Sequence, residues 1–114
     1  MTKVEMHKKI CEELNATYEK KNHDYGDSFN ETFNKLGIIS AITRITDKYN
    51  RLVSLCTLPE HERQVKDESI SDTLLDMANY AIMTEMALRK QNHEKDTFSE
   101  AEADALAEAL DYVK

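Results

Sequence analysis

Apolar residues recur every three or four positions along much of the chain, which is the period of an amphipathic helix. The clearest run opens after Gly37 and advances by four, three, four, three and four residues, through Ile38, Ile42, Ile45, Tyr49, Leu52 and Cys56. This apolar row predicts one long helix. The opposite side of the same helix carries charged residues, which are Arg44, Asp47, Lys48 and Arg51.

Two further helices are predicted before Gly37. Thr2 and Glu5 have the spacing of a capping box, so a first helix is expected to begin there and to end at about residues 20–22. Residues 20–29 are mostly polar and are predicted to form a connection that contains Gly26. A short helix that ends at Gly37 is expected next, with the apolar residues Phe29, Phe33 and Leu36.

The second half of the chain predicts two more helices. Ser69 and Asp72 open a helix that is expected to reach residues 88–90, and a polar loop is predicted at 90–97. A last helix is expected from Ser99, with an alanine-rich apolar face. The chain is therefore predicted to be an all-α bundle of about four main helices in one domain, residues 1–114.

Composition narrows the class of protein further. A chain of 114 residues buries a modest core, so we expect it to form a homo-oligomer. A net charge of −7 argues against general nucleic-acid binding. No apolar run approaches the roughly 18 residues of a membrane span, and the first residues do not resemble a signal peptide. Cys11 and Cys56 lie on apolar rows and are predicted to be buried free thiols, which favours a cytoplasmic location.

The helix that opens at Ser69 is apolar around most of its circumference, with one narrow polar strip. Spacings of four, four and three place the members of this strip, Glu68, Asp72, Asp76 and Asn79, above one another. Their oxygens are hard ligands, suited to Mg²⁺ or Mn²⁺, and Asp47 of the preceding helix could complete the site. The alternative is that these residues cap the helix and form its solvated edge.

The charged flank of the preceding helix also allows two interpretations. Asp47 and Arg51 are spaced as an i,i+4 pair, which is typical of a solvated, salt-bridged surface. Alternatively, Arg44, Lys48 and Arg51 bind phosphate oxygens.

The predicted connection at 20–29 could supply the rest of a nucleotide site. Lys21 and His23 could contact phosphate, Asn22 or Asp24 could bind a sugar or a base edge, and Tyr25 could stack on the base. The alternative is that these residues only end the first helix.

Three blocks of sequence, at residues 21–29, 44–52 and 67–80, together resemble the nucleotide modification associated domain 1 family of phages, prophages and bacteria. A more distant similarity is to MazG-type all-α nucleoside triphosphate pyrophosphatases, which are usually dimers or tetramers and bind Mg²⁺. Asp76 resembles the aspartate of their ExxD motif, whereas Thr73 stands at the position of its glutamate, and the other motif is matched only by Asp47 and Asn50.

These resemblances imply a nucleotide-handling protein that hydrolyses a nucleoside triphosphate with the help of Mg²⁺. The candidate catalytic residues Asp47, Asp72 and Asp76 would hold the metal. A protein that binds and sequesters a nucleotide without hydrolysis is a second possibility. A helical interaction protein whose charges are all solvated is a third. The first two differ in turnover, and the third binds no nucleotide.

Overall fold

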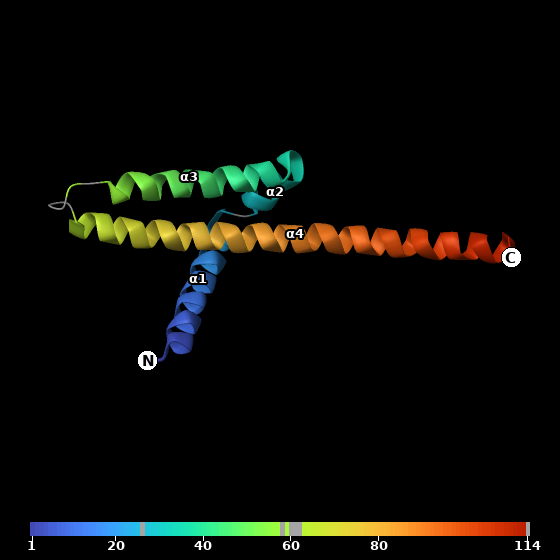
Figure 1. The fold of residues 1–114 in the computed structure, drawn as a ribbon, viewed down its shortest axis with the longest axis horizontal. Helices are drawn as coiled ribbons and strands as arrows, with labels where there is room; N and C mark the ends of the chain where they lie inside the picture. Colours follow the sequence, from blue (N-terminus) through green and yellow to red (C-terminus); the bar gives the residue numbers. More distant parts are fainter. Residues whose placement is uncertain (26, 58, 60–62, 114) are drawn as a thin grey trace. The chain divides into compact units, whose positions relative to one another are not determined.

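The computed structural model describes residues 1–25, 27–57, 59 and 63–113, with side chains described except at 24–25, 63–68, 94–107 and 109–113. Four helices follow one another (Figure 1): α1 (Lys3–Tyr25), α2 (Ser28–Leu36), α3 (Ile38–Cys56) and α4 (Arg63–Val113). No strand occurs in these described ranges. The all-α class predicted from the sequence is confirmed.

The chain divides into two compact units, Met1–Thr84 and Glu85–Lys114. The second unit is the last part of α4, where the Arg89 Nε donates to Glu85 Oε1 at 3.0 Å. The loop predicted at 90–97 is wrong, because these residues are helical. These residues contain no Gly or Pro and are mostly good or tolerable helix formers. The helix therefore continues although the apolar pattern is interrupted. The single domain stays a prediction.

α1 begins as predicted and ends later than predicted. The Thr2 amide donates to Glu5 Oε2 at 3.0 Å and the Glu5 amide to Thr2 Oγ1 at 3.1 Å, so the capping box forms. The polar stretch that begins at Lys20 continues α1 to Tyr25, which corrects the predicted connection. Polarity was the wrong signal, since Lys, Asn and His are tolerated in a helix before Gly26.

Gly37 separates α2 from α3. Its φ of 77° lies in the left-handed region, where a side chain would be strained, and its amide donates to the Phe33 carbonyl oxygen at 2.7 Å. Both helix boundaries at this glycine agree with the prediction.

The core of the first unit is small. Phe29 and Phe33 of α2 are buried, and their ring centroids lie 6.3 Å apart. Leu14 of α1 and Ala41 of α3 are buried with them, and Ala41 is 0% exposed. Thr73 of α4 is also buried, with its hydroxyl donating to the Ser69 carbonyl one turn earlier at 2.6 Å, so its burial leaves no unpaired donor.

The long apolar row of α3 is only partly covered, with Ile45 and Leu52 half-buried. Ile38, Ile42 and Tyr49 are 43%, 45% and 59% exposed. Both cysteines are free, and both are exposed, which corrects the prediction that they are buried. Cys56 belongs to the exposed row, and Cys11 lies in the first half of α1, where residues 1–13 are all exposed.

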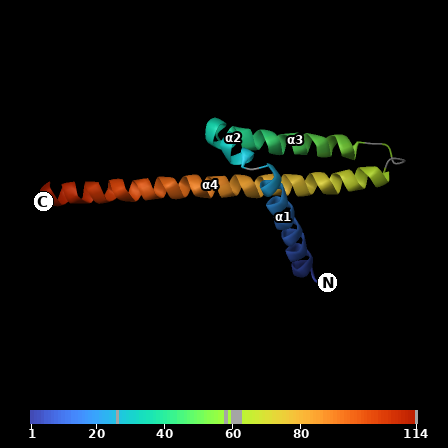
Figure 2. The same cartoon turned by 180° about the vertical axis from the view of Figure 1, so that it is seen from behind.

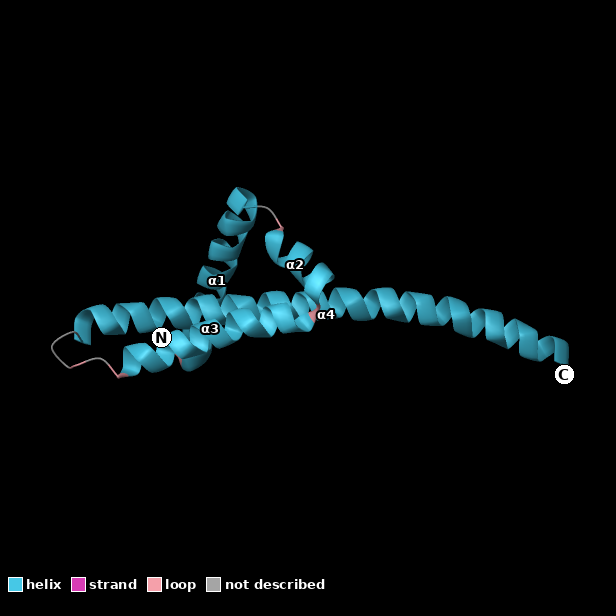
Figure 3. Ribbon diagram, turned by 90° about the horizontal axis from the view of Figure 1, so that it is seen from above, coloured by secondary structure: helices cyan, strands magenta, loops and turns pink. Residues whose placement is uncertain are grey.

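Within the Met1–Thr84 unit, α3 and the first part of α4 lie side by side and run in opposite directions (Figures 1 and 2). The C-terminal end of α1 and the start of α2 lie on one side of this helix pair (Figure 3). The α3–α4 pair therefore has one side covered by other helices of the unit.

Candidate functional site

α3 and α4 face each other through polar side chains. Lys48 Nζ lies 3.4 Å from Asp76 Oδ2, and Arg51 Nε donates to Thr73 Oγ1 at 3.3 Å. One turn further, the Arg44 guanidinium lies 5.8 Å from the centroid of the Tyr80 ring. Each step forward along α3 is a step back along α4, so these contacts follow one antiparallel register. The cationic flank of α3 is therefore turned toward α4.

Asp76 joins three helices. One carboxylate oxygen lies 3.4 Å from Lys21 Nζ of α1, and the other lies 3.4 Å from Lys48 Nζ of α3. The Asp76 side chain is 36% exposed, so water screens both ion pairs and their contribution to stability is modest. A second tie between α1 and α4 is the Asn79 amide nitrogen, which donates to the Leu14 carbonyl oxygen at 3.3 Å. These contacts hold the end of α1 against α4.

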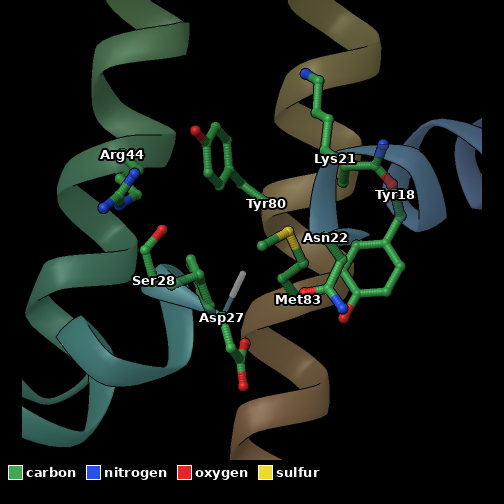
Figure 4. Close-up of a pocket in the computed structure, with 10 residues that line it drawn as sticks. Tyr18, Lys21, Asn22, Asp27, Ser28, Arg44, Tyr80 and Met83 are labelled. Atoms are coloured by element: carbon green, nitrogen blue, oxygen red, sulfur yellow. The ribbon is translucent and has the colours of Figure 1, made fainter. Parts of the chain in front are cut away.

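A cavity of about 210 Å³ opens beside these contacts, between α1, α2, α3 and α4 (Figure 4). Arg44 reaches it from α3, whereas Tyr80 and Met83 reach it from α4 (Figure 4). The end of α1 and the start of α2 supply most of the remaining wall. The full lining is Tyr18, Lys21, Asn22, Asp27, Ser28, Phe29, Arg44, Asn79, Tyr80 and Met83.

Tyr80 is the aromatic centre of this site. The Lys48 Nζ lies 6.0 Å from its ring centroid, in addition to Arg44 at 5.8 Å, so two cations approach one ring at cation–π distance. Phe29 lies 6.2 Å from the same ring and fixes it from the α2 side. The ring, the cations and the amides of Asn22 and Asn79 give the cavity groups for stacking, for anion binding and for hydrogen bonding.

Four of the predicted site residues line the cavity: Lys21, Asn22, Arg44 and Asn79. Lys48 and Asp76 lie beside it, through the contacts given above. His23, Asp47, Arg51 and Asp72 are not among the residues of its wall. The side chains of Asp24, Tyr25 and Glu68 lie outside the described residues, so their predicted roles stay predictions.

The predicted metal ligands do not form a cluster among the side chains that the structure describes, where no three His, Cys, Asp or Glu residues are placed to hold a metal ion. Asp47 and Asp72 are exposed, and Asp76 is occupied by the two lysines. The Asp47–Arg51 ion pair of the alternative interpretation is also not formed by these described side chains, because Arg51 instead contacts Thr73. The metal site with its five proposed ligands stays a prediction.

The aromatic rings of the cavity, Tyr18, Phe29 and Tyr80, are not among the predicted site residues. The available signal was the position of Tyr80, directly after the polar strip at Asn79 and one turn from Asp76. An aromatic residue at the edge of a polar strip is placed to combine stacking with charge.

The fold and the cavity define an all-helical protein with a cationic, aromatic-lined pocket. The chain belongs to the nucleotide modification associated domain 1 family, whose model matches residues 21–88. That segment contains every residue of the cavity wall except Tyr18. The family description connects the chain with nucleotides in general terms.

No curated protein and no solved structure matches this chain. The resemblance to MazG-type enzymes and the phage origin therefore stay predictions. In the part of the chain that the structure describes, no helix is long and apolar enough to cross a membrane.

Proposed function

We propose that this protein binds a nucleotide in the cavity at the junction of its four helices. The observation behind this proposal is that Lys21 and Arg44 share one cavity with the Tyr18 and Tyr80 rings, within the segment that matches a nucleotide-related family. A nucleotide needs both kinds of partner, because its phosphates are anionic and its base is a flat ring.

The charged groups of the site would bind the phosphate. Arg44 can bind two phosphate oxygens at once, whereas Lys21 acts as a point charge. Lys48 and Asp76 beside the cavity and Asp27 in its wall bring the local total to three cations and two carboxylates. The site is thus locally positive on a chain whose net charge is −7, which is the sign that a phosphate requires.

The rings and amides would bind the nucleoside part. Tyr80 offers a ring for stacking at the cavity, and Asn22 and Asn79 offer amide groups to the polar edge of a base or to a sugar. Asn79 already donates from its amide nitrogen to Leu14, so its oxygen is the group that we assign to the ligand.

The volume of the cavity sets how much of the ligand is enclosed. At about 210 Å³ it is smaller than the roughly 300–1,000 Å³ of cavities that bury a drug-sized ligand. We therefore expect one part of the nucleotide to be enclosed and further phosphates to lie outside, toward Lys48 and Arg51.

Calorimetric titration of nucleosides, monophosphates and triphosphates tests this function. Tyr80→Leu fills similar space without a ring and should weaken binding by about 1–3 kcal/mol, as expected for the loss of base stacking. Tyr80→Phe keeps the ring and is the matched control. Equal affinities for wild type and Tyr80→Leu, or no binding of any nucleotide by wild type, would contradict the proposal.

Hydrolysis of a triphosphate to monophosphate and pyrophosphate with Mg²⁺ is the finer proposal, and it rests on the resemblance to pyrophosphatases. The described side chains do not fit a metal in their present contacts, since Asp76 is held by Lys21 and Lys48. We therefore assign no catalytic step. A pyrophosphate-release assay across nucleotides with Mg²⁺ separates a hydrolase from a protein that only sequesters its ligand.

A further inference from the structure

The apolar row of α3 has a counterpart on α4. Along α4, the residues Ile70, Leu74, Met77 and Ala81 follow one another at steps of four, three and four. Leu74 is 50% exposed, Ala81 is exposed, and Ile70 and Met77 are half-buried. Both helices of the pair thus carry an apolar row that remains partly open to solvent.

The polar contacts between α3 and α4 fix where these rows point. At about 100° per residue, Ile42 and Tyr49 lie roughly 100–120° around α3 from Lys48, which faces α4. Leu74 lies roughly 100° around α4 from Thr73, which faces α3, and in the same rotational sense along its own chain. Because the two helices are antiparallel, the two rotations lead to the same side of the pair.

This side is opposite to the cavity. Arg44 and Arg51 lie around α3 from Lys48 in the other rotational sense, and the C-terminal end of α1 and the start of α2 cover that other side (Figure 3). The Met1–Thr84 unit therefore has a ligand side and an apolar side. We call the second one the back face and define it by Ile38, Ile42, Tyr49 and Cys56 of α3 with Ile70, Leu74, Met77 and Ala81 of α4.

The back face needs a cover. Among the described residues, no large side chain is less than 2% exposed, so the unit has no fully enclosed core of its own. A chain of this size buries only roughly 65% of the surface of its unfolded form and is marginally stable, so further burial of apolar surface has a large effect on its stability. A second copy is a partner that is present wherever this chain is made.

We propose that two copies of this chain pack back face to back face. None of the charged residues of α3 or of residues 70–81 lies in the face, so two copies meet without like charges across the contact despite the net charge. The steps of three and four are those of helix seams that interdigitate. Two adjacent helices about 28 Å long and about 20 Å wide together present roughly 600 Å² per copy, near the roughly 800 Å² of a standard interface.

This dimer places the two cavities on opposite outer sides. Each cavity is lined by one chain alone, so each copy binds its own ligand and the two sites do not share residues. The surface is also distinct from the alanine-rich end of α4, whose side chains lie mostly outside the described residues. The inference does not rest on the proposed nucleotide function, and its test uses no nucleotide.

Light scattering on the full chain tests the back face. Wild type should be a dimer at micromolar concentration, and Tyr49→Asp should shift it to monomer, because a carboxylate would be buried without a partner. Asn50→Asp places the same group one residue further, outside the face, and should remain dimeric. Leu74→Asp should repeat the effect from α4. A monomeric wild type, or equal behaviour of Tyr49→Asp and Asn50→Asp, would overturn the proposal.

The two native cysteines give a second measurement that does not depend on the folding of a variant. Both thiols are exposed in the single chain, but only Cys56 lies in the back face. In wild type, the reaction of Cys56 with a thiol reagent should slow several-fold as protein concentration rises, while the Cys11 rate stays constant. Rates that are independent of concentration for both thiols, in a sample that scatters as a dimer, would place the interface elsewhere.

Discussion

The two flanks of α3 show opposite relations between polarity and burial. The flank with Arg44 and Lys48 is turned toward α4 and is half-buried, although its residues are charged. The flank with Ile42 and Tyr49 is apolar and exposed. In a finished core the arrangement would be reversed. This contrast is the basis of the two proposals above, that the charged flank contacts a ligand and that the apolar flank packs against a second copy.

The inward and outward flanks should differ most in their tolerance of a substitution to leucine. Ala41 is 0% exposed and Ile42, the next residue, is 45% exposed. Ala41→Leu should lower the free energy of unfolding by about 1–3 kcal/mol, because the core has no space for the added carbons. Ile42→Leu keeps the volume of its site and should change stability by less than about 1.5 kcal/mol. Urea unfolding measures both variants, and a larger loss for Ile42→Leu would reverse the assignment of the flanks.

Within the charged flank, Arg44 in the cavity wall should contribute more to nucleotide binding than Arg51 outside it. Arg44→Met keeps the length of the side chain without its charge and should weaken triphosphate binding by about 1.5–3 kcal/mol, the usual effect of a charged hydrogen bond. Binding of the bare nucleoside should change less, because the proposed partner of Arg44 is phosphate.

Arg51→Met should have a smaller effect than Arg44→Met, since Arg51 contacts Thr73 and is not part of the cavity wall. Arg89→Met removes an equivalent charge from the second unit, where Arg89 pairs with Glu85, and serves as the control. If calorimetric titration shows a larger loss of affinity for Arg51→Met than for Arg44→Met, the phosphate site lies outside the cavity.

The smallest expected effects concern Asp76. Without metal, Asp76→Asn loses two partly exposed ion pairs and should change stability by at most about 1 kcal/mol. If the predicted metal site forms, Mg²⁺ or Mn²⁺ should raise the melting temperature of wild type and leave Asp76→Asn unmoved, since a ligand of the folded state stabilises it. Melting curves of wild type that do not respond to metal, with or without nucleotide, would refute the site.

Much of the secondary structure follows from local signals in the sequence. The Thr2 and Glu5 capping box, the glycine at 37 and the row that begins at Ile38 are each readable within a few residues, and each marks a real helix boundary. The errors have a local cause too. The polar stretches at 20–25 and 90–97 predict connections between helices. Because they contain no Gly or Pro, they instead extend α1 and α4.

The site was only partly predictable. Lys21, Asn22 and Arg44 were predicted to bind a nucleotide and Asn79 to bind a metal, because charged and amide groups show their chemistry in the sequence, and all four line the cavity. The roles of Tyr18 and Tyr80 could not be predicted, because a tyrosine in an apolar row looks the same in sequence whether it fills a core or lines a cavity.

By itself, the sequence determined which residues share a face of each helix, because the 3.6-residue period is a property of the backbone. Only the tertiary structure decided which face is turned inward. That choice depends on contacts between residues far apart in the chain, such as Lys48 with Asp76 and Lys21 with Asp76. Periodicity contains no information about these pairs, so it could not show that the charged flank of α3 faces α4 and that Ile38, Ile42 and Tyr49 of its apolar row remain exposed.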